Sequence, residues 1–254
     1  MALLVVENLT KRFGGLLAVN SVSFGVETAE ILSVIGPNGA GKTTLFNMLT
    51  GIYAPTTGSA SLAGRPLVGA KPHQIVAAGL ARTFQNIRLF GSMSALENVM
   101  VGRHSRTKGG FWTALLPGKA GVAEEKQIAQ RASEELDFVG LGHCAAQTAS
   151  CLCYGDQRRL EVARALATDP QLVLLDEPAA GMNPQETRSL IALIRRIQKR
   201  GITVVLIEHD MNLVMNLSDR VVVMNFGQKI ADGAPAQVRS DPQVIAAYLG
   251  SGAA

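Results

Sequence analysis

Aromatic residues and cysteines are scarce in this chain. Aromatic residues make up 5% of its 254 residues, with a single tryptophan, and there are three cysteines. Proteins that bind single strands of nucleic acid stack bases on aromatic side chains, so the composition argues against a nucleic-acid partner. An odd number of cysteines without C-x₂-C spacing argues against a disulfide framework or a zinc site, and indicates a reduced, cytoplasmic protein.

A secretory leader and long apolar runs are also missing. Residues 1–6 contain no basic residue and Glu7 follows at once, so we expect no signal peptide. Apolar runs such as 202–207 have the length of a strand, whereas a membrane helix needs about 20 residues. The net charge of +4 comes from scattered basic residues, which is typical of solvated helix faces rather than of a nucleic-acid surface.

The order of the local patterns predicts an α/β core interrupted by helices. With 47% hydrophobic residues, the chain can bury one sizeable core. Residues 86–169 have mainly helical patterns and are predicted to form an inserted subdomain, in which the Gly-rich segment 105–121 is a surface loop or a short hairpin of helices. Strands are expected at 3–9, 19–26, 30–35, 59–63, 81–84, 172–176 and 202–207, helices at 95–101, 124–139, 184–200, 211–217 and 242–249, and a hairpin at 220–225 and 228–231.

A glycine-rich segment follows the apolar run 31–35 and precedes a helical pattern at 44–50. It matches G-x-x-x-x-G-K-[ST], the phosphate-binding loop, in the strand, loop and helix order that the motif requires. Its glycines let successive N–H groups point at phosphate oxygens, and the helix N-terminus favours negative charge. Lys42 can reach the β- and γ-phosphates, and the Thr43 hydroxyl can ligate Mg²⁺. The predicted nucleotide-binding residues here are Gly36, Pro37, Asn38, Gly39, Ala40, Gly41, Lys42, Thr43 and Thr44.

Two carboxylates follow another apolar strand pattern. The run 172–176 delivers Asp176 to the site end of the sheet, where it can hold Mg²⁺ through water. In an extended chain the Glu177 side chain points the other way, toward solvent or a second subunit, where a general base for an attacking water is needed. Two ordinary carboxylates at a strand end are the alternative, but their position after a phosphate loop and a helical insertion favours the functional interpretation.

His209 and Gln85 also stand at strand ends. His209 follows the strand 202–207 and Glu208, so it can donate to a γ-phosphate, although a lone histidine at such a place is more often structural. Gln85 closes the strand 81–84, and its amide can touch Mg²⁺ or the attacking water and can sense the orientation of the inserted subdomain. The candidate catalytic residues are Glu177, His209 and Gln85, and the candidate metal ligands are Thr43, Gln85 and Asp176.

The segment 152–166 indicates which class of nucleotide-binding protein the chain resembles. Leu152-Cys-Tyr-Gly-Asp156 is followed by Gln157-Arg-Arg-Leu-Glu-Val-Ala-Arg-Ala-Leu166. Here the chain resembles the ATP-binding-cassette (ABC) ATPases, whose signature Leu-Ser-Gly-Gly-Gln opens a helix. The resemblance covers about residues 3–250, with every motif in the family's order. It implies a single α/β P-loop NTPase domain over 1–254, with a core and antiparallel β subdomain at about 1–85 and 170–254 and a helical subdomain at about 86–169.

The resemblance also implies a composite ATP site. In that family two cassettes pack head to tail, and each ATP lies between the phosphate loop of one subunit and the signature of the other. It further implies that Phe13 stacks on adenine and that the cofactors are ATP and Mg²⁺. A homodimer and a heterodimer are both compatible with the sequence. The signature positions that would close the partner's site are Cys153, Tyr154, Gly155 and Asp156.

Three signature residues depart from the family pattern. Cys153 replaces the usual serine and is a weak hydrogen-bond donor. Tyr154 replaces the first glycine. Asp156 replaces the usual glutamine and brings a carboxylate near the nucleotide, which Arg158 or Arg159 is expected to neutralise. Hydrolysis is still expected because other key positions match the family, namely Lys42, Gly155, Glu177 and His209.

Finer resemblance points to one transporter group. The segments 12–20, 82–90, 177–184, 208–215 and 244–250 are similar to the LivG-type ATP-binding subunits of bacterial branched-chain amino-acid importers. This implies a related second ATPase, two membrane permeases and, indirectly, a periplasmic binding protein as partners at the cytoplasmic face of the inner membrane. Urea or amide importers and lipopolysaccharide-export ATPases have similar cassettes and are the alternatives within transport. A soluble cassette protein or a non-hydrolysing regulator fits less well, since the chain has one cassette and intact Glu177 and His209.

Overall fold

The computed structural model describes residues 2–104 and 119–249. They belong to two compact units, one formed by Met1–Arg82 with Gln171–Ala254 and the other by Thr83–Pro170. We call these the core unit and the helical unit. Most of the segment expected to be a loop or helical hairpin, 105–121, lies outside the described residues.

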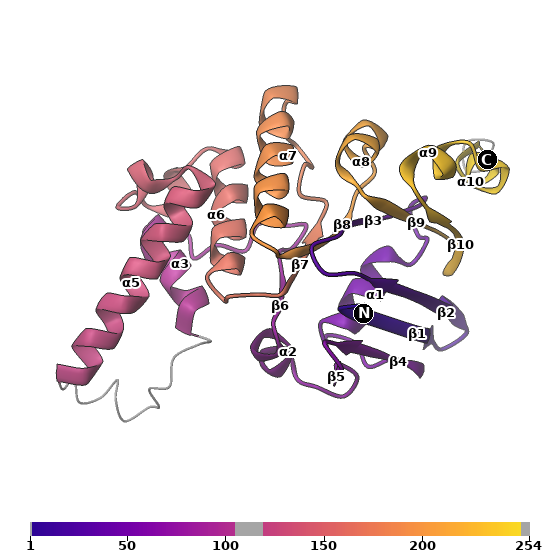
Figure 1. Ribbon diagram of the computed structural model, residues 1–254, viewed down its shortest axis with the longest axis horizontal. Helices are drawn as coiled ribbons and strands as arrows, with labels where there is room; N and C mark the ends of the chain where they lie inside the picture. Colours follow the sequence, from indigo (N-terminus) through magenta and orange to yellow (C-terminus); the bar gives the residue numbers. More distant parts are fainter. Residues whose placement is uncertain (1, 105–118, 250–254) are drawn as a thin grey trace. The chain divides into compact units, whose positions relative to one another are not determined.

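A six-stranded sheet organises the core unit, in the order β10-β9-β3-β8-β7-β6 (Figure 1). All neighbours in it are parallel except the edge pair of β9 and β10. Its apolar strands are buried on both faces, as a covered parallel sheet requires. The strand expected at 81–84 begins one residue earlier and ends at Arg82. The bounds are β3 Ile31–Ile35, β6 Leu80–Arg82, β7 Leu172–Asp176, β8 Thr203–Ile207, β9 Arg220–Asn225 and β10 Gln228–Gly233.

An antiparallel sheet, in the order β2-β1-β4-β5, shares a hydrophobic core with one face of the parallel sheet. Helix α1 contributes Phe46 and Leu49 to that core. Because side chains alternate along a strand, β9 sends Met224 into it and Val223 into a second core on the opposite face. The bounds are β1 Leu4–Phe13, β2 Leu16–Val26, α1 Lys42–Leu49, β4 Thr57–Leu62 and β5 Arg65–Pro66.

The opposite face is covered by C-terminal helices (Figure 1). In α7 the buried positions include Leu190, Ile194 and Ile197, whereas Ile191 is half-buried. The sequence analysis did not predict α2, a short helix in which only Ile75 is buried. The bounds are α2 Pro72–Ala78, α7 Pro184–Lys199, α8 Met211–Leu217, α9 Pro235–Arg239 and α10 Pro242–Leu249.

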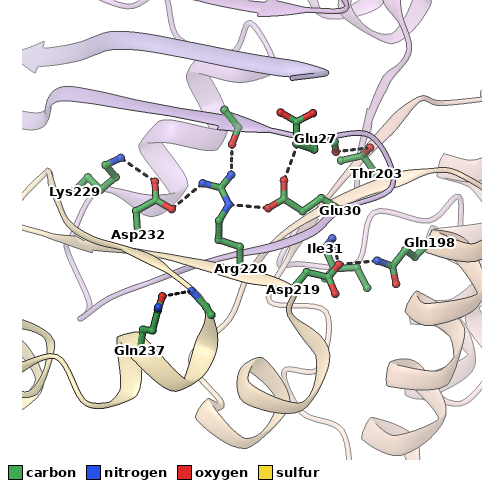
Figure 2. A network of polar contacts seen from close by, with 12 residues as sticks. Glu27, Glu30, Ile31, Gln198, Thr203, Asp219, Arg220, Lys229, Asp232 and Gln237 are labelled. Atoms are coloured by element: carbon green, nitrogen blue, oxygen red, sulfur yellow. Dashed lines mark hydrogen bonds and ion pairs between the residues drawn. The ribbon is translucent and has the colours of Figure 1, made fainter. Parts of the chain in front are cut away.

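Arg220 joins both sheets of the core unit at the amino ends of the parallel strands. Figure 2 shows its guanidinium between Glu30, at 2.7 Å, and Asp232, at 2.8 Å. It also donates to the Gly25 carbonyl of β2. Nearby, Asp219 accepts hydrogen bonds from the Ile31 amide and the Gln198 side chain (Figure 2). This polar network fixes the edge of the sheet that lies away from the phosphate loop.

Within its described residues, the helical unit has three main helices that contact one another, α3 Ala95–Arg103, α5 Lys119–Val139 and α6 Tyr154–Leu166, with 3₁₀ turns at Gly142–Cys144 and Ala149–Cys151. Asn98 is fully buried there, and its side chain both accepts from the Phe90 amide and donates to the Phe90 carbonyl. None of the described helices combines the length and apolarity that a membrane crossing needs. The parallel sheet, the antiparallel sheet and the helical unit confirm the predicted fold class.

Candidate functional site

The phosphate loop, Asp176 and His209 follow three adjacent parallel strands. β8 lies between β3 and β7, with Ile207 paired to Val34 on one side and to Asp176 on the other. The loop follows β3, and His209 comes two residues after β8. Carboxyl ends of parallel strands meet at one sheet edge, so the fold brings these three elements together as the sequence predicted.

Two loop positions have no room for a side chain. Gly36 has φ +147°, and a Cβ there would lie 2.0 Å from the Met224 carbonyl oxygen. Gly41 has φ +97°, and its Cβ would lie 2.3 Å from the Ala18 carbonyl oxygen. β9 and β2 therefore press on the loop backbone at both ends. This packing fixes the cradle of N–H groups that begins helix α1 at Lys42.

Lys42 is buried against its own loop. Its ammonium donates to the carbonyls of Gly36, at 2.7 Å, and Pro37, at 3.0 Å. Burial lowers the pKa of Lys42 below its usual value, while the charges of Glu177 and Asp176 act in the opposite direction. An ammonium has three donors, so a third remains that can meet a phosphate oxygen.

Asp176 is held by an arginine that the sequence analysis did not single out. Asp176 Oδ2 accepts from Arg82 Nη2 at 2.7 Å, and both side chains are almost wholly buried. Its other oxygen, Oδ1, is buried and has no hydrogen-bond partner among the described residues. Mg²⁺ prefers oxygen ligands, and the residues offer two, the Asp176 oxygen without a partner and the hydroxyl of exposed Thr43 in the first turn of α1. These residues of the core unit therefore fit the metal.

The backbone at Glu177 differs from the expectation. The sequence predicts an extended chain there, but Glu177 has φ +47°, a left-handed conformation that is uncommon for a residue with a side chain. β7 ends at Asp176, and the Glu177 amide donates to the Ile207 carbonyl at 3.0 Å. The chain turns at this residue, and such strain is typical of functional sites.

His209 lies within reach of two carboxylates. Its Nδ1 is 3.9 Å from Glu177 Oε2 and 3.9 Å from Glu208 Oε2, and its side chain is 63% exposed. Glu208 is buried and accepts from the amides of Ala179, at 3.0 Å, and His209, at 3.1 Å. Burial raises the pKa of Glu208 above its usual value, and these two hydrogen bonds oppose the rise. Glu208 thus connects the segment after Glu177 to His209, a role that sequence reasoning missed.

An exposed aromatic pair stands at the end of β1. Phe13 and Tyr53 are 40% and 38% exposed, and their rings meet edge to face with centroids 5.3 Å apart. Lys11 Nζ lies 4.9 Å from the Phe13 centroid and donates to the Ala54 carbonyl at 2.7 Å. Phe13 is thus partly exposed, as contact with a planar partner requires, and it packs against Tyr53, a residue that no motif in the sequence indicates.

The signature opens helix α6 of the helical unit. Cys153 is the N-cap, and its thiol makes no capping hydrogen bond. Gly155 is buried, whereas Tyr154 is 43% exposed. The carboxylate of Asp156 lies 3.6 Å from Arg159, so Arg159, of the two arginines considered, is its partner.

Arg158 turns inward instead and holds the segment of Gln85. Its guanidinium donates to the Phe84 carbonyl at 2.9 Å, to the Gln85 carbonyl and to the Tyr154 hydroxyl at 2.8 Å. The Gln85 side chain is left at the surface. Sequence reasoning could not assign this role because Arg158 and Arg159 are adjacent and chemically alike, and only the burial of Arg158 distinguishes them.

Comparisons with known proteins agree with this geometry. The family described as "ABC transporter" matches residues 19–180, and a family described as "Branched-chain amino acid ATP-binding cassette transporter" matches residues 228–254. The chain is 49% identical to the high-affinity branched-chain amino acid transport ATP-binding protein BraF of Pseudomonas aeruginosa, over 98% of both proteins. It is 49% identical, with the same coverage, to LivG of Escherichia coli.

Solved structures show the same fold. The ADP conformation of MJ1267, an ATP-binding cassette of an ABC transporter, superposes with a TM-score of 0.86 at 32% identity, over 98% of this chain and 99% of the other. A nucleotide-free ATP-binding cassette from an ABC transporter gives a TM-score of 0.85, also at 32% identity, with the same coverage of both chains.

Proposed function

The chain belongs to the ABC transporter ATP-binding family, and on that premise we propose that it powers the uptake of branched-chain amino acids by hydrolysing ATP at the cytoplasmic face of the membrane. Two membrane permeases would be its direct partners, with a second cassette subunit and, indirectly, a periplasmic binding protein. The observation that carries the choice of solute is the 49% identity to BraF and LivG over 98% of the chain, together with the branched-chain family match at its C-terminal residues.

In this proposal the core unit binds the triphosphate. The loop 36–43 cradles the phosphates with its N–H groups, and Lys42 meets the β- and γ-phosphates. Phe13 stacks on the adenine, supported edge-on by Tyr53. Thr43 and Asp176, and in this proposal the Gln85 amide, would hold Mg²⁺, which would supply positive charge to offset that on the phosphoryl group.

Glu177 and His209 act on the water and the γ-phosphate. Glu177 takes the proton of the attacking water as general base, and its carboxylate lies 3.9 Å from the His209 ring nitrogen. His209, beside it, donates to the γ-phosphate. The buried carboxylate of Glu208 accepts from the backbone amides of His209 and Ala179, and so it holds the segments that carry His209 and Glu177 close to each other.

The second half of each site comes from a partner cassette in this proposal. The N-terminus of α6, with Cys153, Tyr154, Gly155 and Asp156, faces the γ-phosphate bound by the partner's loop. Arg159 neutralises Asp156, so the carboxylate does not repel the nucleotide. ATP binding closes the dimer, hydrolysis reopens it, and the Gln85 segment transmits the change to the permeases.

Reconstitution of the chain with two branched-chain amino-acid permease subunits tests the proposal. Vesicles holding the complex should take up leucine, isoleucine and valine in the presence of ATP, and Lys42→Ala should abolish both uptake and hydrolysis. Arg239→Ala, at an exposed position of helix α9 in the core unit, serves as the matched control and should leave both unchanged. Uptake of urea or amides alone, or co-purification with a lipopolysaccharide-export complex, would reject the branched-chain assignment.

A further inference from the structure

Arg82 is a buried cation inside the core unit, next to the proposed metal site. Its side chain is 5% exposed and that of Asp176 is 3% exposed. Nη2 donates to Asp176 at 2.7 Å, while Nη1 donates to Asn47 Oδ1 at 2.7 Å and to Thr50 Oγ1 at 3.1 Å. The guanidinium carbon also lies 5.7 Å from the centroid of the Phe46 ring. One side chain is thus fixed by two elements, β7 and α1.

A pair buried this deeply is not explained by stability alone. Desolvating two charges offsets most of their attraction, and apolar residues of similar size are often as stabilising in such places. A planar guanidinium has another property that an apolar side chain lacks, which is to fix its partners at set angles. The structure uses that property on the two elements that carry the proposed metal ligands.

Those elements are the end of β7 and helix α1. β7 ends with Asp176, and α1 begins with Lys42 and Thr43 and carries Asn47 one helical turn after Thr43. Arg82 occupies one oxygen of Asp176 and leaves Oδ1 as the oxygen without a partner among the described residues. The same guanidinium therefore sets which carboxylate oxygen is available and how far the carboxylate lies from α1.

We propose that Arg82 is a positioning residue for Mg²⁺: it orients Asp176 so that Oδ1 receives the hydrated metal, and it ties the carboxylate to the helix of Thr43. The inference rests on the proposed function, in which Asp176 and Thr43 hold the metal. Arg82 itself touches neither nucleotide nor metal. Replacing a residue that orients a metal ligand typically lowers metal affinity by about 10–100-fold, so the effect is large enough to measure.

The test compares nucleotide binding with and without the metal. The affinity of the purified chain for ATP is measured by calorimetry in excess Mg²⁺ and in EDTA, and the ratio of the two affinities reports the metal. Arg82→Met should lower this ratio by about tenfold or more, with the EDTA affinity changed by about twofold at most, because the phosphate loop is untouched. Arg220→Met is the matched control, because it removes an ion-paired arginine at the opposite end of the same sheet. It should leave the ratio unchanged.

Two further variants keep the test decisive. Asp176→Asn should lower the ratio by itself. Adding Arg82→Met to Asp176→Asn should cause no further loss, because both substitutions act through the Asp176 carboxylate. If Arg82→Met does not fold, Arg82→Lys replaces it. A lysine keeps the charge but cannot bond Asp176, Asn47 and Thr50 in one plane, and its ratio should fall about threefold to tenfold.

The outcomes separate this inference from the proposed function. A folded Arg82→Met or Arg82→Lys protein with an unchanged ratio overturns the role of Arg82, whatever solute the transporter carries. Failure of leucine uptake with normal Mg²⁺-dependent ATP binding rejects the solute and leaves Arg82 as assigned. A ratio that falls equally in Arg220→Met also overturns it, because the loss would then follow from general destabilisation.

Discussion

The hydroxyl of Tyr154 accepts a hydrogen bond from Arg158 at 2.8 Å, and the same guanidinium donates to the backbone carbonyls of Phe84 and Gln85. Tyr154 stands where the related signature has a glycine, so this chain adds a hydroxyl that bonds the arginine holding the Gln85 segment. Glu161 of the same helix is also buried. Its Oε1 accepts from the Arg88 amide at 2.8 Å, and its Oε2 lies 3.4 Å from Arg158 Nη1. The start of the signature helix and residues 84–88 therefore form one hydrogen-bonded assembly within the helical unit.

Loss of Arg158 should destabilise the protein far more than loss of its neighbour. Arg158→Met leaves the buried carboxylate of Glu161 without its nearer cation, and breaking a buried pair costs about 3–5 kcal/mol. Arg159→Met removes a half-exposed pair with Asp156, worth about 0.2–1 kcal/mol. Urea unfolding of the two variants measures the difference. Equal losses would contradict the assembly described here.

Cys153→Ser should strengthen both the helix and the site. A serine at the N-cap of α6 can accept a backbone hydrogen bond that the thiol does not, which is worth about 0.5–2 kcal/mol. As a better donor it should also raise ATP turnover at limiting ATP, by roughly fivefold for one hydrogen bond of about 1 kcal/mol. Cys151→Ser, an exposed cysteine outside the cap, is the control and should change neither quantity. Turnover that stays level while stability rises would remove the thiol from the proposed ATP contact.

Glu177→Gln should abolish turnover while ATP still binds. The amide keeps the size of the side chain but cannot take a proton, and loss of a general base costs about 10²–10⁴-fold in rate. An ATP-bound dimer should then accumulate, which size-exclusion chromatography with MgATP detects. Glu7→Gln changes an exposed residue of β1, and this variant should remain active with unaltered monomer–dimer exchange. Normal turnover in Glu177→Gln would assign the base to another group.

Motif spacing and the order of the apolar runs predicted most of the fold and much of the candidate site from the sequence. The loop, Asp176 and His209 could be placed together because each follows an apolar run, and parallel strands end at one edge. The helix expected at 242–249 is present as α10 with the same bounds.

Contacts that depend on three-dimensional packing could not be placed in that way. The left-handed turn at Glu177 follows from where β7 stops, which no local pattern indicates. Arg82 and Arg158 are ordinary basic residues in the sequence, and only their burial among specific acceptors reveals what they hold. α2 was missed because its seven residues bury a single apolar side chain, too few for a helical period.

Lys42 should make ATP binding and stability respond to alkaline pH in opposite directions. Burial lowers the pKa of Lys42, so its ammonium is lost at a lower pH than in the unfolded chain. In that window the unfolded state binds more protons, and the stability of the nucleotide-free protein therefore rises with pH. ATP requires the charged form, so its affinity should fall over the same window, and the gain in melting temperature on adding MgATP should shrink.

Lys42→Arg keeps its charge well above pH 11, so its weaker ATP stabilisation should not vary between about pH 8 and 10.5. Thermal unfolding with and without MgATP across that range measures both slopes, and a wild-type ATP response as flat as that of Lys42→Arg would contradict a titrating Lys42 at the phosphates.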